Sequence, residues 1–461
     1  MSTTDKAELT VSKKLVWQYG FGSMFCTGPN SNFINYMFLF FMTDIAGIPA
    51  GIAATAYTVC SIIRPIDTFL SGVIIDATNL KWGKFRSWNI IAVTCTLLFS
   101  GALFLPYGFE NKMVWCVVCV FFYTVATTAY NVNWTAHRSL VGIMSKTSQD
   151  NLTLVSAANV AAQLSGLLYG LGGSYLLKAW AGAGSMQYAA TEYTWALLAF
   201  IGGVIIFRIS KPYDKPRENL VRDAAKKKDE NRVSFFEMLK TFRGPGLILF
   251  LGSTLSCIQQ GFFTTLLAYF TKYVLGNPAV LGYAVSVNYA GGIVGSIIMP
   301  KITKGIPKKN LYIFGLLFTS VAYFCMYFFG MTGAGFLIIR FLIGCCGAAT
   351  SGIALPGIGN DLADYYEMKG QSRARGFVQS SYGTAIYVGS FISSAVSSYA
   401  LAFLGYEAGA EMTPSLLKAI CIMMAVGPAV VNILAAIVMS FYKVDEKELD
   451  RYRKERAARN N

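Results

Sequence analysis

The sequence predicts an all-α membrane protein with twelve transmembrane helices arranged in two six-helix halves. Three observations lead to this fold class. The 461 residues are 54% hydrophobic and only 14% charged, whereas soluble domains carry about 25% charged residues. Apolar runs of about 20 residues, the length that spans a bilayer, recur along the chain. A long charged segment then separates six such runs from six more.

The expected spans follow from the apolar runs, and the connections between them are short. Their approximate limits are 15–43, 49–75, 88–107, 112–138, 152–179, 190–209, 245–274, 279–303, 309–330, 333–357, 376–404 and 413–442. The corresponding domains are a cytoplasmic tail (1–14), an N-terminal bundle (15–210), a cytoplasmic linker (211–244), a C-terminal bundle (245–442) and a second cytoplasmic tail (443–461). The first ten residues are polar and lack the apolar region of a signal peptide.

The loops alternate in charge, which predicts the orientation. One set is rich in Lys and Arg, and the opposite set, at 43–50, 106–112 and 331–335, is nearly free of them. Basic loops remain in the cytoplasm. We therefore expect both termini to be cytoplasmic in a plasma (inner) membrane, and we expect a monomer.

Composition also excludes other classes. The net charge of +15 lies in short loops and tails, which is typical of membrane orientation rather than of nucleic-acid binding. His137 is the single His and the ten Cys form no cluster with it, so no metal site or other cofactor is expected. The sequence contains no HExxH, GxSxG or Walker motif, so an enzyme is not expected.

The two halves have similar sequence patterns after their second spans. Gly83 to Arg86 follow one such span, and Gly305 to Lys309 follow the other as a second Gly-containing basic loop. Two related six-span halves joined by a linker are the plan of major facilitator transporters. In such folds the substrate binds midway between the repeats.

The residues from Arg64 to Trp88 combine a charged membrane helix with a basic loop. Arg64 and Asp67 are three residues apart and share a helix face. Charges inside a membrane helix are costly and by default indicate function. The alternative is a structural ion pair that joins helices.

Several stretches resemble the glycoside–pentoside–hexuronide:cation symporters, the melibiose-permease branch of the major facilitator superfamily. They are YGFG at Tyr19–Gly22, FMTDIAGI at Phe41–Ile48, RPID at Arg64–Asp67, WGKFR at Trp82–Arg86, NDLADYYE at Asn360–Glu367 and RARG at Arg373–Gly376. They occur in the family's order along the chain. The resemblance implies secondary transport of a small organic solute coupled to Na⁺ or H⁺.

The resemblance places the coupling site on the second span, with one departure. Asp67 matches the family's first carboxylate, but Ser71 stands where a second acid is usual. We expect Asn131 to supply a further oxygen to a Na⁺ ion. Alternatively, a lone carboxylate takes up a proton, which Arg64 would oppose. Uncoupled uniport and exchange therefore stay open.

Polar and aromatic side chains inside the spans are candidates for solute binding. We expect Trp134 to stack on a sugar ring and Arg138 to bind a carboxylate, unless Arg138 only marks the cytoplasmic end of its span. Trp134 and Asn159 stand where the melibiose-permease branch has charged sugar-binding residues, so a different solute is expected. The full candidate set is Asn30, Asn32, Tyr130, Trp134, Arg138, Asn159, Gln163, Gln259 and Tyr382.

Charged residues near the cytoplasmic ends of both halves are candidates for a gate that opens and closes in alternating access. They are Arg64, Asp76, Lys84, Arg86, Arg340, Asp361, Asp364 and Glu367. We expect Arg340 to pair with Asp361 or Asp364.

Two classes of carrier remain open from the sequence. The first is a cation-coupled carrier of a glycoside, hexuronide or related solute. The second is an uncoupled carrier or exchanger of a non-sugar or lipid-like solute, which lysolipid carriers of the same branch exemplify.

Overall fold

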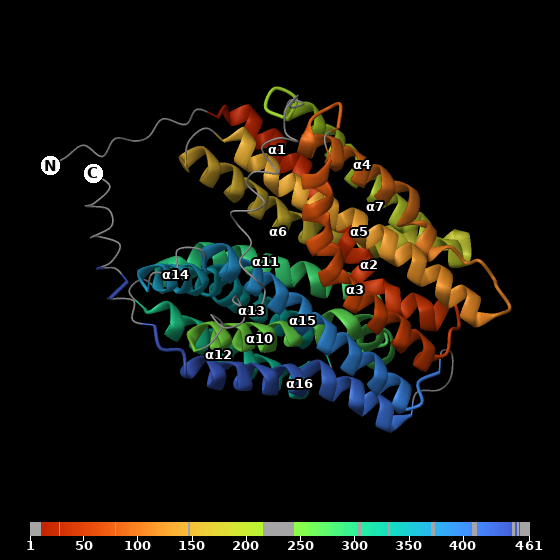
Figure 1. The fold of residues 1–461 in the computed structure, drawn as a ribbon. Coiled ribbons are helices and arrows are strands. Elements are labelled where there is room, and N and C mark those ends of the chain that lie inside the picture. The colour runs from red at the N-terminus through yellow and green to blue at the C-terminus, as the bar shows by residue number, and fades with distance from the viewer. Residues whose placement is uncertain are drawn as a thin grey trace. The chain divides into compact units, whose positions relative to one another are not determined.

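The computed structural model describes residues 11–26, 28–78, 80–145, 148–214, 244–302, 306–330, 332–369, 374–407, 413–444, 448, 449 and 451. These residues are helical or lie in turns, and none is in a strand (Figure 1). They form two compact units, one made of α1 to α7 and the other mainly of α10 to α16. Most of the predicted tails and of the linker lie outside the described residues.

In the first unit, α5 lies beside both α3 and α4, and α1 packs against α6 and α7 (Figure 1). The helices and turns of this unit are α1 (Lys13–Cys26), α2 (Pro29–Phe40), η1 (Phe41–Ile45), α3 (Ala50–Ala77), α4 (Lys84–Phe99), η2 (Ala102–Phe104), α5 (Lys112–Met144), α6 (Ser148–Ala179), η3 (Ala181–Met186) and α7 (Gln187–Ile209).

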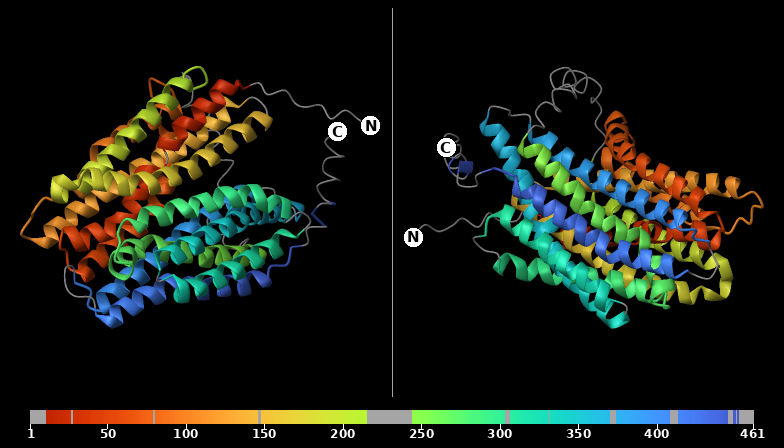
Figure 2. Two further views of the ribbon diagram at one scale, coloured as in Figure 1. Left: turned by 180° about the vertical axis from the view of Figure 1, so that it is seen from behind. Right: turned by 90° about the horizontal axis from the view of Figure 1, so that it is seen from below.

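In the second unit, α10 packs against α15 and α16, and α12 packs against α13 and α16 (Figure 2). The elements are α10 (Pro245–Tyr269), η4 (Phe270–Val274), α11 (Val280–Ile302), α12 (Lys308–Phe329), α13 (Gly333–Gly347), η5 (Ala348–Ala354), α14 (Leu355–Met368), α15 (Ala374–Phe403) and α16 (Pro414–Ser440).

Ten helices within the described ranges are long and apolar enough to cross a membrane, and each coincides with a predicted span. The two remaining predictions, 15–43 and 49–75, are not among them. The first is divided into α1 and α2, which have 14 and 12 residues. The second is α3, whose apolar run contains Arg64, Pro65 and Asp67. The structure thus supports a polytopic membrane fold without confirming the count of twelve.

Both units contain the same helix ending, ten residues long. Residues 41–50 and 270–279 share a π-helical turn followed by Gly, one further residue, Pro and Ala. Gly47 and Gly276 have φ of +63° and +66°, a conformation that glycine adopts without steric cost. The Ala46 N–H donates to the Phe41 carbonyl just as the Leu275 N–H donates to that of Phe270. The structural repeat is therefore precise at this end of each half.

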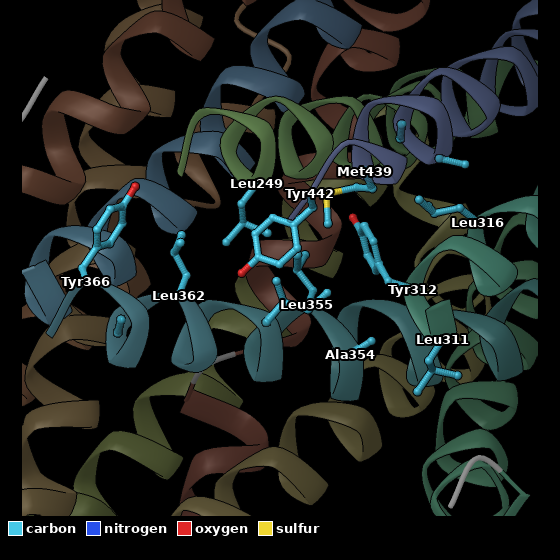
Figure 3. Close-up of a cluster of buried hydrophobic side chains, with 14 residues drawn as sticks. Leu249, Leu311, Tyr312, Leu316, Ala354, Leu355, Leu362, Tyr366, Met439 and Tyr442 are labelled. Atoms are coloured by element: carbon cyan, nitrogen blue, oxygen red, sulfur yellow. The ribbon is translucent and has the colours of Figure 1, made fainter. Parts of the chain in front are cut away.

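Close packing of aromatic and aliphatic side chains builds the interior of the second unit. Figure 3 shows Leu249 of α10, Tyr312 of α12 and Leu355 of α14 directed toward one another, with Met439 of α16 beside them. These residues are at most 5% exposed. Lipid tails are as apolar as leucine, so complementary packing rather than water exclusion stabilises such a cluster.

Candidate functional site

The interface of α3 and α5 carries a line of polar groups in an otherwise apolar part of the first unit. Asp67 and Ser71, one turn apart on α3, are 7% and 0% exposed. Thr128 Oγ1 donates to Asp67 Oδ2 over 2.8 Å. One turn further along, the Ser71 and Thr135 hydroxyls lie 3.0 Å apart. Two predicted coupling residues are thus on one buried interface, each beside a threonine of α5.

Asn131 lies between those two threonines on α5. It is 6% exposed, and its carbonyl oxygen accepts a hydrogen bond from Thr135 Oγ1 over 2.9 Å. Its side-chain Nδ2 has no acceptor among the described residues. A buried amide without a partner is costly. An acceptor group that enters this interface therefore finds an amide N–H donor that is not engaged elsewhere.

This donor set suits a small hard cation or a proton. One carboxylate, several hydroxyls and an amide all present oxygen, which is the ligand that such cations prefer. His, Cys, Asp and Glu form no group of three that could hold a metal ion within the part of the chain described. One carboxylate with neutral oxygens therefore fits a weakly held, exchangeable ion.

Arg64 is not the hydrogen-bond partner of Asp67. The Asp67 carboxylate accepts its hydrogen bond from Thr128, and Arg64 is half-buried one turn earlier on α3. The alternative reading, a structural Arg64–Asp67 ion pair, stays a prediction.

An aromatic column runs along α5 beside the polar interface. The rings of Tyr130 and Trp134 are stacked with centroids 6.3 Å apart. The Arg138 guanidinium lies 4.5 Å from the Trp134 centroid. The spacing of four residues brings these side chains to one helix face, and all three are half-buried. The column offers a flat aromatic surface with a cation at one end.

The other predicted solute residues differ in exposure. Asn30 is 2% exposed, and its Oδ1 has no partner among the described residues. Asn32 and Gln163 are half-buried, and Asn159 is exposed. α2, which carries the two asparagines at 30 and 32, packs against α6, which carries Asn159 and Gln163.

The second unit contributes Gln259 of α10, which is half-buried with no described partner for Oε1. The side chain of Tyr382 lies outside the described residues, as do those of the gating candidates Asp76 and Glu367.

Arg340 is the most deeply buried cation of the second unit. It is 0% exposed. Its Nη2 donates to Asn288 Oδ1 over 2.8 Å and its Nη1 donates to the Tyr323 hydroxyl over 3.2 Å. Its Cζ lies 3.4 Å from the centroid of Phe263. The expected pairing of Arg340 with Asp361 or Asp364 is therefore wrong, because neutral groups of α11 and α12 lie within its reach.

Asp361 pairs with Lys308 instead. The Lys308 ammonium lies 2.8 Å from Oδ1 and 2.7 Å from Oδ2 of Asp361. The Asp361 side chain is 4% exposed and that of Lys308 is 38% exposed. Asp364, one turn later on α14, is also buried, at 8% exposed. The predicted gate residue Asp361 thus belongs to an ion pair within its own half.

Asp214 organises the start of α4, which sequence reasoning missed. Its carboxylate accepts the backbone N–H groups of Lys84, Phe85 and Arg86 over 3.1, 2.7 and 2.7 Å. Gly83, with φ of +118°, leaves room for this contact, because a Cβ there would collide with Asp214. A carboxylate at a helix N-terminus satisfies orphan donors and the helix dipole. The signal available was an Asp in the first residues of the linker.

Replacement of Asp214 by Ala will destabilise the first unit by about 1–2 kcal/mol, since three N–H groups of α4 lose their acceptor. Thermal unfolding of the purified protein measures the loss. The matched control is Glu110→Ala, which removes a carboxylate from an exposed loop position. Equal melting temperatures for the two variants would contradict the capping role.

The sequence analysis also missed two further buried polar side chains, His137 and Glu192. His137 of α5 is 1% exposed, and its Nε2 lies 3.0 Å from the Tyr19 hydroxyl and 3.1 Å from that of Ser23. Glu192 of α7 is fully buried. A carboxylate inside the apolar run 190–209 is by itself a signal that could have been read from the sequence.

Comparisons with known proteins identify the family of this chain. A family model described as MFS/sugar transport protein matches residues 18–446. An Escherichia coli (strain K12) protein named glucuronide carrier protein homolog is 23% identical over 423 residues, which cover 89% of this chain and 88% of that protein. The isoprimeverose transporter of Lactiplantibacillus pentosus is 24% identical over 453 residues, 96% of this chain and 92% of that one.

Solved structures show the same fold. The crystal structure of a D-xylose-proton symporter matches with a TM-score of 0.62 at 14% identity, over 93% of this chain and 96% of that one. The fold is therefore that of the major facilitator superfamily, and the protein is a multi-pass membrane transporter rather than an enzyme. The chain belongs to the MFS/sugar transport protein family, which confirms its resemblance to the glycoside–pentoside–hexuronide:cation symporters.

Proposed function

We propose that this protein moves a glycoside, a hexuronide or a related solute across the plasma (inner) membrane by alternating access, coupled to Na⁺ or H⁺. The observation that carries the coupling proposal is the Asp67 carboxylate, which is 7% exposed and faces Thr128 across the α3–α5 interface. A buried carboxylate inside a membrane helix is costly unless it has a function or a partner charge. An ion that binds there in one state of the cycle compensates this charge.

In this proposal the ion lies between Asp67, Ser71 and Asn131. The carboxylate supplies the charge, and the hydroxyl and amide supply neutral oxygens. A single carboxylate favours a monovalent ion, because one negative charge is neutralised by one positive charge. We further propose that both termini are cytoplasmic and that the transporter acts as a monomer.

The solute lies against the aromatic column of α5. Trp134 stacks on the face of a sugar ring, and Arg138 at the end of the column binds an anionic substituent. Two relatives whose names specify a glucuronide and isoprimeverose support a sugar-like solute. Asn30, Asn32, Asn159 and Gln163 supply hydrogen bonds to hydroxyls, and Gln259 and Tyr382 do so from the other half.

Gating in this proposal uses charges near the cytoplasmic ends: Arg64, Asp76, Lys84, Arg86, Asp361, Asp364 and Glu367. The Lys308–Asp361 pair stabilises one half while the two halves rearrange. Arg340 is better explained as a buried cation that joins α11, α12 and α13 through Asn288 and Tyr323.

Counterflow and uptake in proteoliposomes test the function directly. The panel holds neutral glycosides, hexuronides and lysolipids, each with and without a Na⁺ gradient and a pH gradient. We expect exchange of a sugar-like solute and gradient-driven uptake with one of the two ions. Exchange of a lysolipid alone, without stimulation by either ion, would favour the uncoupled lipid-like carrier instead.

Replacement of Arg138 by Gln will lower the uptake of anionic solutes and leave that of neutral solutes nearly unchanged. Loss of a charge-assisted hydrogen bond costs about 1.5–3 kcal/mol, so uptake of a hexuronide will fall about tenfold or more. Uptake of a neutral glycoside, measured in the same vesicles, serves as the control and will change little. Unchanged hexuronide uptake would remove Arg138 from the solute site and leave it as a residue of the cytoplasmic helix end.

A further inference from the structure

A basic pocket lies between the first turns of α4 and the last turn of α7, away from the proposed coupling and solute residues. Its volume is about 630 Å³. Three cations, two aromatic rings and one aliphatic side chain line it. They are Trp82, Arg86, Ile90, Phe207, Arg208 and Lys211. α4 and α7 are neighbours in the first unit. The pocket therefore belongs to a single compact part of the molecule.

Arg86 is the buried element of this pocket. It is 6% exposed, and its guanidinium Cζ lies 4.3 Å from the Phe207 centroid. Its Nε has no hydrogen-bond acceptor among the described residues. The nearest acid, Asp214, directs its carboxylate to three backbone N–H groups of α4. A buried guanidinium with an unused donor is costly unless a ligand supplies an acceptor.

The two other cations, Arg208 and Lys211, are exposed at the mouth of the pocket. The three cations outnumber the one acid, Asp214, so the site has a net positive charge. Guanidinium groups match phosphate oxygens in geometry as well as in charge. The chemistry of the pocket thus selects a phosphate anion.

The surroundings indicate that the anion is carried by a lipid. Leu197 and Ile201, which are 49% and 45% exposed, lie on the same stripe of α7 as Arg208. Trp82 is 55% exposed and makes an edge contact with Phe207, with centroids 5.7 Å apart. Tryptophan and basic side chains at the end of an apolar helix face are typical of the membrane–water boundary. An acyl chain can lie along the apolar stripe while its phosphate reaches the pocket.

We propose that this pocket binds the phosphate of an anionic phospholipid, with Arg86 as the buried contact and Arg208 and Lys211 as the outer contacts. Basic pockets between transmembrane helices on the cytoplasmic side are suited to such headgroups. The bound lipid joins the start of α4 to the end of α7. This site shares Arg86 with the proposed gate and no residue with the proposed solute and coupling-ion sites.

Lipid binding to the purified full-length protein tests the proposal. Native mass spectrometry and thermal shift are recorded with phosphatidylglycerol, with phosphatidylcholine and with inorganic phosphate. Phosphatidylglycerol will bind and raise the melting temperature, and the other two will not. The Arg208→Gln/Lys211→Gln variant will bind phosphatidylglycerol about tenfold to thirtyfold more weakly, because each basic residue near a membrane surface contributes about 1 kcal/mol. Arg86→Lys, which keeps the charge but loses the fork geometry, will also weaken binding.

The matched control is Lys178→Gln/Lys443→Gln, which removes two positive charges from exposed positions outside the pocket. It will bind phosphatidylglycerol like the unaltered protein. Equal affinity of the Arg208→Gln/Lys211→Gln variant and this control for phosphatidylglycerol would overturn the proposal that the pocket is a lipid site. Stabilisation by inorganic phosphate equal to that by phosphatidylglycerol would overturn the assignment to a lipid.

Discussion

Replacement of Asp67 by Asn will abolish ion-driven accumulation of solute while exchange of solute across the membrane continues. The variant retains the shape of the side chain and its contact with Thr128 but loses the carboxylate charge that binds the cation in our proposal. An amide does not neutralise a cation and does not take up a proton at physiological pH. We expect the accumulation ratio to fall about tenfold or more, since one lost charge contact of about 1.5–3 kcal/mol corresponds to that factor.

Uptake and counterflow in the same proteoliposomes measure this result, because counterflow is driven by the solute and needs no ion gradient. The control is Glu407→Gln, which removes an exposed carboxylate and should leave both rates unchanged. Undiminished accumulation by Asp67→Asn would show that the coupling ion binds elsewhere, and Glu192 would then be the next candidate.

Replacement of Ser71 by Asp provides the opposite test at the same interface. It restores the second carboxylate that the related symporters have at this place. Ser71 is 0% exposed, so two carboxylates one turn apart will require a bound cation to offset their repulsion. If Asp67 binds the ion, thermal stability of this variant will depend on Na⁺ more strongly than that of the unaltered protein.

Replacement of Lys308 by Met will destabilise the second unit more than replacement of Asp361 by Asn. The Asp361 side chain is 4% exposed and cannot reach water when its cation is removed. The Lys308 side chain is 38% exposed and can turn into solvent when its acid is neutralised. Removing one partner of a fully buried pair costs about 3–5 kcal/mol. Because Lys308 is partly solvated, we expect about 1–3 kcal/mol for Lys308→Met and less than half of that for Asp361→Asn.

Thermal unfolding of the single variants and of the double variant measures this asymmetry. The double variant will recover part of the stability that Lys308→Met loses, since no buried carboxylate then remains at position 361. An equal or larger loss for Asp361→Asn would mean that the carboxylate contributes through contacts other than the ion pair.

The sequence was sufficient for ten of the twelve predicted spans and for the kind of protein. The resemblance named Asp67 and Ser71 together on the second span, and the structure brings both to the interface of α3 with α5. Tyr130, Trp134 and Arg138 were named as candidates on one span, and in α5 they form the aromatic column. These predictions succeed because the periodicity of a helix is local and depends only on residues a few positions apart.

Prediction failed wherever a partner lies on another helix. Arg340 was expected to pair with an acid, but Asn288, 52 residues away, is its partner. Asp361 is bound by Lys308, 53 residues away. Asp214 caps α4 from 128 to 130 residues away. Which side chains meet across two helices depends on helix rotation, on relative height and on how closely the backbones approach.

The stretch from Arg64 to Trp88 illustrates which features the sequence determines and which depend on the tertiary structure. Its residues alone determined a membrane helix with a buried charge followed by a basic loop, because apolar length and charge pattern suffice for that. Only the tertiary structure decided that Thr128 is a hydrogen-bond donor to Asp67, and that Asp214 caps the first turn of α4. The physical reason is that hydrogen bonds and ion pairs extend over about 3 Å, and a sequence does not specify which distant groups are brought within that distance.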